Sequence, residues 1–130
     1  MKRKRLLAGG MVVAVAAAVG TWVSVPESPP CGNKLVQEAQ SPDGIRRALL
    51  FERSCGGALP TFTHVSIVGP HDKKIAVGGN TFVTEGRSDS TATRIRWSDP
   101  RTLIVATAAR SSATRTEVWK KGVLVRYEDR

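Results

Sequence analysis

Two cysteines and two histidines are the side chains of this chain that could support covalent or metal chemistry. A Cys55 thiolate activated by His64 would be a nucleophile, although such a site also needs a third group that orients the histidine. His71 is followed by Asp72, a pair typical of metal phosphohydrolases, but a metal site needs more ligands than these residues offer. The alternatives are a disulfide bond for the cysteines and an ordinary loop turn for His71 and Asp72.

The stretch between the cysteines favours the disulfide. SPDG at 41–44 is a turn signal, because proline sets φ at the second position and glycine closes the turn. If Ser41 faces Gly44, Cys31 and Cys55 come within one residue of facing each other, and a β-bulge could absorb the difference. Facing residues place their Cβ atoms about 4.5–5.5 Å apart, close to the separation in a disulfide. We therefore predict a Cys31–Cys55 disulfide, worth on the order of 3 kcal/mol through chain entropy.

The N-terminus is predicted to be a targeting segment. Residues 1–5 form a basic n-region, and residues 6–25 pass without a charge. A helix of that length spans roughly 30 Å, the thickness of the hydrocarbon core of a bilayer. The basic residues are expected to stay in the cytoplasm, which places residues 26–130 on the other side of the membrane. Disulfide bonds persist outside the cytoplasm, on that side of the membrane.

Three fates of this segment remain open. An uncleaved single-pass anchor in the cytoplasmic membrane, with the N-terminus inside and the C-terminal domain outside, is the first expectation. A signal peptide cleaved near Ala18 would instead release a periplasmic or secreted protein. A lipid anchor on Cys31 is the third, although VPESPP separates this cysteine from the apolar run. Residues 26–30 form a Pro-rich linker that disfavours helix and marks the domain boundary.

Residues 31–130 are predicted to form one exported all-β domain of about seven strands. Short runs alternate apolar and polar residues between glycine, proline, aspartate and serine. The expected strands are 34–40, 45–53, 61–68, 80–85, 93–97 and 102–108, with a short one at 75–77. Residues 114–120 and 123–127 form either one kinked strand or a hairpin turning at Lys121-Gly122. Because no helical crossover for parallel strands is evident, we expect an antiparallel meander after the N-terminal hydrophobic helix, folded as a sandwich or small open barrel.

Charge indicates a second kind of chemistry, the binding of anions. The net charge is +9 at pH 7, and the basic residues beyond the N-terminal run are spread along the chain. In the strand 93–97, Ile95 and Trp97 point one way while Arg94 and Arg96 point the other. The two arginines could contact an anionic surface such as lipid headgroups or cell-wall polymer, and a solvated strand face is the alternative. Nucleic acid is not expected, because no aromatic side chains are interleaved with these arginines.

Short sequence motifs, and the order in which they occur, resemble those of two groups of known proteins. SPDG between two strands is similar to the blade hairpin of TolB-type, WD40-like propellers, but a propeller needs repeated blades and the sequence holds one copy. The order of Cys31, SPDG, LFERSCGG, THVSI, GGNTFV, RIRW and RTLIV resembles a family of small uncharacterised bacterial exported proteins over roughly residues 31 to 107. This resemblance implies an N-terminal membrane or signal segment and a β-rich domain, and it brings no catalytic residues.

These observations predict a non-enzymatic accessory or binding module of the bacterial cell envelope. We expect it to use no cofactor or metal, to meet the membrane through residues 6–25, and to bind an envelope protein or an anionic polymer. The alternatives are a small envelope enzyme that uses a thiol or histidine, at Cys55, His64 or His71, and a purely structural envelope protein.

Topology provides the first test. An alkaline-phosphatase fusion after Arg130 is expected to be active, because that enzyme needs disulfides that form only outside the cytoplasm. A cytoplasm-dependent reporter fused at the same residue is the matched control and should be inactive. An inactive phosphatase fusion, with an active cytoplasmic reporter, would contradict export of residues 26–130.

Overall fold

The computed structural model describes residues 31–72 and 78–130 of the chain. Its longer strands are β1 (Gly32–Gln40), β2 (Arg47–Ser54), β3 (Phe62–Val68), β4 (Phe82–Glu85), β5 (Arg94–Asp99), β6 (Thr102–Thr107) and β9 (Val123–Asp129). Two-residue strands β7 (Arg115–Thr116) and β8 (Trp119–Lys120) and the 3₁₀ helix η1 (Arg110–Ser112) complete the described part. The all-β prediction is confirmed for these residues, and strand ends lie within two residues of those expected. The predicted N-terminal helix and the short strand at 75–77 lie outside the described residues.

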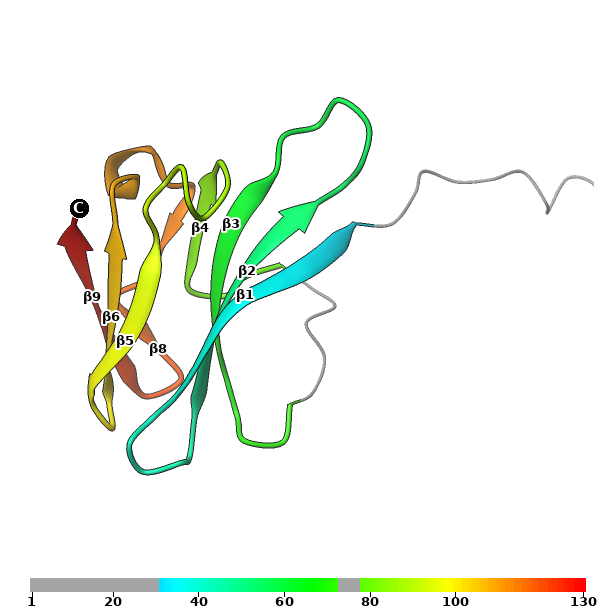
Figure 1. Ribbon diagram of the computed structural model, residues 1–130. Helices are drawn as coiled ribbons and strands as arrows, with labels where there is room; N and C mark the ends of the chain where they lie inside the picture. Colours follow the sequence, from blue (N-terminus) through cyan, green and yellow to red (C-terminus); the bar gives the residue numbers. More distant parts are fainter. Residues whose placement is uncertain (1–30, 73–77) are drawn as a thin grey trace, which may run out of the picture.

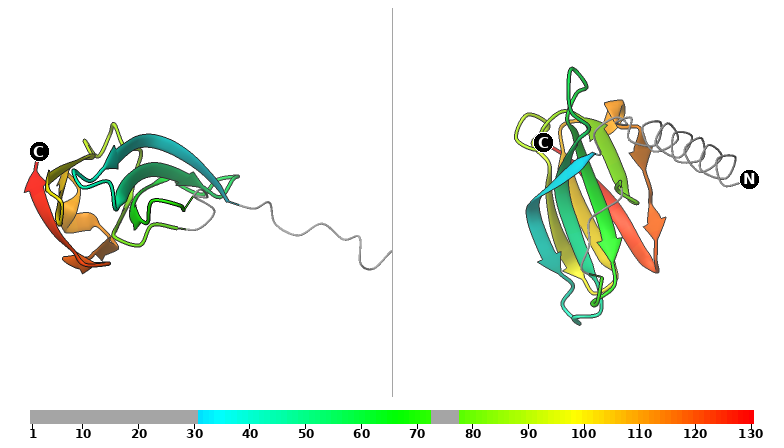
Figure 2. Two further views of the ribbon diagram at one scale, coloured as in Figure 1. Left: turned by 90° about the horizontal axis from the view of Figure 1, so that it is seen from below. Right: turned by 90° about the vertical axis from the view of Figure 1, so that its right-hand side faces the viewer.

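The strands form two sheets that pack face to face (Figure 1). Sheet A has the order β1-β2-β3-β4-β7, and sheet B has the order β5-β6-β9-β8. Figure 2 shows them as two layers, one in front of the other. Between the layers lies the apolar core, formed by Ala48, Leu50, Val65, Ile67 and Phe82 from sheet A and Ile95, Leu103, Val105, Val123 and Val125 from sheet B. Because successive side chains of a strand point to opposite faces, every second residue of these strands faces the other sheet.

The expectation of a wholly antiparallel meander is wrong at one pair of strands. β6 and β9 run parallel, with Leu103 opposite Val125 and Val105 opposite Tyr127. Residues 108–122 connect them, and β7 within this segment pairs with β4 of sheet A before β8 returns to sheet B. A parallel pair needs a crossover of about a dozen residues or more, and this irregular segment provides that length without the α-helix that usually fills it.

The first hairpin has a wider turn than predicted. The backbone N–H of Gly44 donates to the carbonyl of Ser41 (2.9 Å), so that the SPDG turn is present. However, the Asp43 carboxylate accepts hydrogen bonds from the Ser41 hydroxyl (2.6 Å) and the Ile45 N–H (3.1 Å), which holds Ile45 outside the ladder. The backbone N–H of Ser41 therefore donates to the carbonyl of Arg46 (2.8 Å), and β2 begins two residues later than expected.

A β-bulge in β1 then corrects the register towards the cysteines. Leu35 faces Phe51, but Gln37 faces Leu50, so that Val36 is an extra residue on the β1 side. A bulge places two residues of one strand opposite one residue of the other. Beyond it the register continues to Gly32 opposite Ser54, which leaves the next residues on each strand, the two cysteines, facing each other.

Of the two alternatives for the C-terminal residues, one kinked strand or a hairpin, the structure shows the hairpin. Trp119 of β8 faces Leu124 of β9, and Lys120 faces Val123. Between them Lys121 and Gly122 both have positive φ, 50° and 76°. Two positive φ values in a two-residue loop are typical of a type I′ turn, whose twist matches that of the strands. β7 is separate from this hairpin and lies at the edge of sheet A.

Side chains join the two sheets where β1 and β5 lie next to each other. The amide of Gln37 donates to the carbonyl of Ile95 (2.8 Å) and accepts from its N–H (3.0 Å). The indole N–H of Trp97 donates to the carbonyl of Ala39 (2.8 Å). The Gln37 contacts satisfy backbone groups at the edge of β5, and the Trp97 contact satisfies a carbonyl of β1. Together they cover edges that would otherwise be open to further pairing.

Candidate functional site

The outer face of sheet B gathers arginine side chains. Cross-strand partners share one face of a sheet, and Arg94 pairs with Ala106 while Arg96 pairs with Ile104. Ile104 in turn pairs with Arg126 of β9. The structure places Ile95 in the core and leaves Arg94, Arg96 and Arg126 exposed, as their alternation predicts. We call Arg94, Arg96, Arg126 and the adjacent Arg130 the basic face.

One arginine of the basic face is held by a carboxylate. Arg96 donates from Nη1 to Glu128 Oε2 (2.9 Å) and from Nη2 to Glu128 Oε1 (2.7 Å). This two-point contact raises the pKa of Arg96, and the same hydrogen bonds hold the pKa of Glu128 below its usual range. A bidentate pair fixes the orientation of both groups. Arg94, Arg126 and Arg130 then carry the remaining positive charge of this face.

A shallow hollow of about 280 Å³ lies within the basic face. Its lining consists of Arg94, Ile95, Arg96, Ala106, Glu128 and Arg130. Arg94 donates from Nη1 to the carbonyl of Thr93 (2.7 Å), which anchors its side chain beside the hollow. The guanidinium groups that line the hollow present planar, multiple N–H donors to a phosphate or carboxylate. The arrangement can bind an oxyanion.

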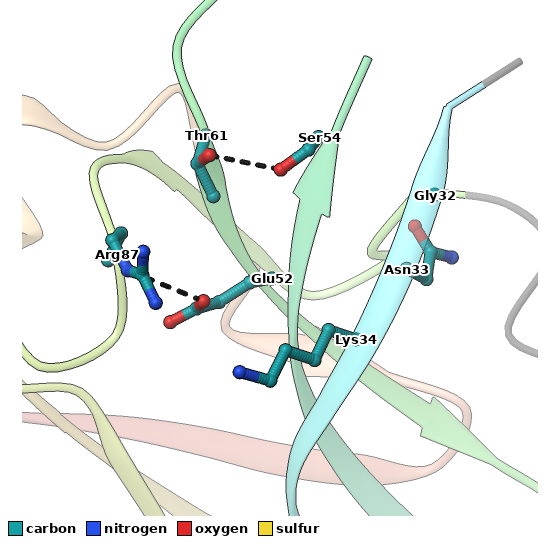
Figure 3. A pocket seen from close by; sticks show the side chains of 7 residues that line it. All are labelled: Gly32, Asn33, Lys34, Glu52, Ser54, Thr61 and Arg87. Atoms are coloured by element: carbon teal, nitrogen blue, oxygen red, sulfur yellow. Dashed lines mark hydrogen bonds and ion pairs between the residues drawn. The ribbon is translucent and has the colours of Figure 1, made fainter. Parts of the chain in front are cut away.

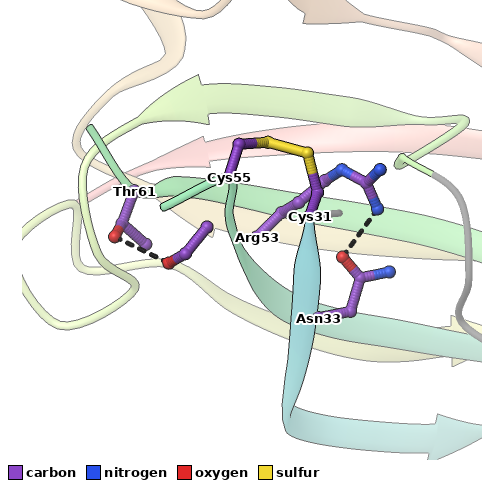
Figure 4. The surroundings of a disulfide bond; sticks show 6 residues. Cys31, Asn33, Arg53, Cys55 and Thr61 are labelled. Carbon is purple, nitrogen blue, oxygen red and sulfur yellow. Dashed lines mark hydrogen bonds between the residues drawn. A yellow bond between two sulfur atoms is a disulfide. The ribbon is translucent and has the colours of Figure 1, made fainter. Parts of the chain in front are cut away.

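The predicted disulfide is confirmed (Figure 4). The sulfur atoms of Cys31 and Cys55 are bonded at 2.03 Å, and their Cα atoms are 3.9 Å apart. Next to the bond, the side chains of Asn33 and Arg53 meet across the two strands (2.8 Å), as do the hydroxyls of Ser54 and Thr61 (3.0 Å). Both cysteines are consumed by the bond, so that neither can supply the thiolate of the alternative enzyme hypothesis.

His64 is a buried structural residue on the outer face of sheet A. Its Nδ1 accepts a hydrogen bond from the N–H of Gly79 (2.8 Å), and its ring stacks on Phe51 with centroids 5.3 Å apart. A Cβ at position 79 would lie 2.9 Å from the His64 Cβ, so glycine is needed for this close approach. Burial, and secondarily the charge of Arg53, lowers the pKa of His64 to about 4. The ring is therefore neutral at pH 7.

His71 and Asp72 form the expected turn. The Asp72 carboxylate accepts from the N–H of Gly69 (2.9 Å), and the Asp72 N–H donates to the carbonyl of Gly69 (3.4 Å). Within residues 31–72 and 78–130, no three histidine, cysteine, aspartate or glutamate side chains group as metal ligands would. No helix in those ranges has the length and hydropathy that crossing a bilayer requires.

Comparison with known proteins identifies no relative of this chain. No protein-family model, no curated protein and no solved structure matches this chain. The functional argument therefore rests on the chain's own residues.

Sequence reasoning found half of the basic face. Alternation around Ile95 identified Arg94 and Arg96, because both lie on one strand. Arg126 was not identified, because its place beside Ile104 depends on the parallel pairing of β6 and β9. The alternation of VLVRYED gave a usable signal, since it places Arg126 and Glu128 together on one face of β9.

Burial of neutral His64 predicts a pH-dependent stability. The folded-state pKa of about 4 lies below the unfolded value of about 6.5. Between these values the unfolded chain binds the extra proton, so the free energy of unfolding falls as the pH falls. We expect a loss of about 1 to 2 kcal/mol between pH 6.5 and pH 5, measured by urea unfolding.

The variant His64→Asn tests this assignment, since the asparagine oxygen can accept the Gly79 N–H but does not titrate. It should remove most of the pH dependence in this range. His71→Asn, at an exposed turn residue, is the matched control and should keep it. Equal pH dependence in His64→Asn and in the unmodified chain would contradict the assignment.

Proposed function

We propose that this chain is a non-enzymatic binding module of the cell envelope, and that its basic face holds an anionic envelope polymer. The observation that supports this most strongly is the placement of Arg94, Arg126 and Arg130 on one exposed side of sheet B, around a carboxylate already engaged by Arg96. Guanidinium groups match phosphate and carboxylate oxygens with several N–H donors each.

The backbone holds these groups at regular positions. Arg94 and Arg96 are two residues apart on one strand, a rise of about 6.6–6.8 Å, and Arg126 is on the strand beyond β6. Ile104 is only 5% exposed although it faces outward between Arg96 and Arg126. Methylene stems of arginines that lie on apolar surface, with the charged ends in water, fit this burial. Such a display suits a ligand with repeated charges better than a single ion.

The proposed envelope location agrees with the covalent chemistry of the domain. Disulfides persist outside the cytoplasm, and the Cys31–Cys55 bond joins the first two strands directly after the predicted linker at 26–30. In this proposal residues 6–25 anchor the chain in the cytoplasmic membrane, or are cleaved to release it, and residues 31–130 face the polymer.

Polymer binding and its salt dependence test this function. Full-length chain in a non-ionic detergent is titrated with poly(glycerol phosphate), and affinity is followed as salt increases. We expect saturable binding that weakens with salt, because exposed charge contacts are screened. Arg94→Gln or Arg126→Gln should each weaken binding about two- to fivefold, consistent with the loss of one exposed charge pair.

Arg115→Gln is the matched control, since it removes the same charge from an exposed arginine at the edge of sheet A. It should leave polymer affinity unchanged. If all three variants weaken binding equally, net charge rather than the basic face is responsible and the proposal fails. Tighter binding to anionic lipid vesicles or to duplex DNA than to the polymer would also overturn it, as would crosslinking in envelopes that captures a protein but no polymer.

A further inference from the structure

A second pocket lies at the disulfide end of the domain, away from the hollow of the basic face. It has a volume of about 350 Å³ and is lined by Gly32, Asn33, Lys34, Glu52, Ser54, Thr61 and Arg87. Three ionisable side chains meet there from β1, β2 and the loop after β4 (Figure 3). Because Lys34 pairs with Glu52 across the strands, both lie on the side of sheet A that faces sheet B.

Glu52 is a buried carboxylate that one residue holds in place. The residue is 8% exposed, and its Oε2 accepts hydrogen bonds from the N–H of Ser88 (2.9 Å) and the Ser88 hydroxyl (2.8 Å). Burial acts to raise the pKa of Glu52, but these hydrogen bonds and the charges of Arg87 and Lys34 outweigh it and lower the pKa. The carboxylate is therefore ionised at neutral pH, and its position is fixed.

The other carboxylate oxygen of Glu52, Oε1, accepts no hydrogen bond from Ser88 and lies near Arg87 instead. This Oε1 forms an ion pair with Nε of Arg87 at 3.8 Å, a distance too long for a hydrogen bond. Within the described part of the chain, no N–H or O–H donates to Oε1. The side chains of Lys34 and Arg87 extend towards Glu52 from either side (Figure 3), and both remain open to solvent. The pocket thus combines one charged acceptor with two charged donor groups.

We propose that this pocket binds a small zwitterion that carries an ammonium group beside a carboxylate, such as an α-amino acid. The ammonium donates to Glu52 Oε1, and the carboxylate accepts from Arg87 and Lys34. A plain anion would gain the two cations but would lie beside the Glu52 carboxylate, and a plain amine would lie beside the two cations. Only the zwitterion meets both kinds of group with opposite charge.

The chemistry of the rim agrees with a polar ligand. Ser54 and Thr61 place a pair of hydroxyl groups next to the charged residues, with their oxygens 3.0 Å apart. Gly32 faces Ser54 across the pocket end of the hairpin, and among the described residues a Cβ at position 32 would meet nothing within 4 Å. The volume also accommodates an amino acid with a side chain larger than a methyl group.

The probes alanine, propionate and ethylamine separate the three ligand classes. Each is titrated into ¹⁵N-labelled full-length chain in a non-ionic detergent, and amide shifts of Gly32, Ser54 and Ser88 are followed by NMR. We expect saturable shifts with alanine at a Kd on the order of 1 mM, realistic for a ligand of this size. Propionate and ethylamine should bind at least about tenfold more weakly, because each forgoes a charged hydrogen bond.

Glu52→Gln gives the sharpest variant. Its amide oxygen can still accept the two Ser88 hydrogen bonds, while its NH₂ replaces the acceptor at Oε1 with a donor. The variant should lose alanine and bind propionate more tightly than the unmodified chain does. Lys34→Gln, at an exposed residue, should weaken alanine binding without affecting the fold. Arg94→Gln belongs to the basic face and should leave alanine binding unchanged.

Two results would overturn the zwitterion site. The first is equal binding of alanine and propionate, or of alanine and ethylamine, by the unmodified chain. The second is the absence of saturable shifts with alanine at these three amides. Because the polymer experiment depends on Arg94 and Arg126 and this one on Glu52 and Lys34, either proposal can fail while the other stands.

Discussion

In an antiparallel strand, residues 35 and 37 should point to the same face, because side chains alternate with a period of two. In β1 they do not. Leu35 pairs with Phe51 on the outer face of sheet A, whereas Gln37 pairs with Leu50, which belongs to the core. The extra residue Val36 reverses the alternation at this point. The arrangement of β1 against the rest of the molecule depends on this one-residue insertion.

Three features lie in register only because of the bulge. On its N-terminal side, Lys34 faces inward beside Glu52, and Cys31 faces Cys55. On its C-terminal side, Gln37 faces inward and bonds the edge of β5. A strand without the insertion could place either Lys34 or Gln37 on the inner face but not both, since a one-residue slip exchanges the faces. The pocket and the junction of the two sheets therefore depend on the same local irregularity.

The arginines of the basic face come from strands outside that hairpin. The basic face requires the β5–β6 hairpin, the parallel pairing of β6 with β9, and the return of the chain through β8. The two surfaces also differ in character. The basic face is exposed and its charges are screened by salt, whereas Glu52 is buried and held by Ser88, so that its charge acts at close range. In the two proposals the same small domain presents an extended surface for an anionic polymer and a compact pocket for a zwitterion.

The sequence predicted those features that depend on neighbouring residues. Alternation placed Ile95 inward and Arg94 outward, and the turn chemistry of SPDG brought the cysteines close enough to predict their bond. It did not predict the site of the bulge, because no residue type in LVQ marks Val36 as the extra one. The β6–β9 pairing and the burial of Glu52 were also missed. Both join segments far apart in the chain, and Glu52 looks like an ordinary solvated charge until Ser88 is placed beside it.

The register of β1 against β2 tests this account most directly. Cross-strand nuclear Overhauser effects between backbone protons report which residues face each other in the hairpin. The account predicts contacts between Leu35 and Phe51 and between Gln37 and Leu50, with Val36 unpaired. Contacts between Gln37 and Leu49, continuing an unbroken register from Leu35, would contradict it.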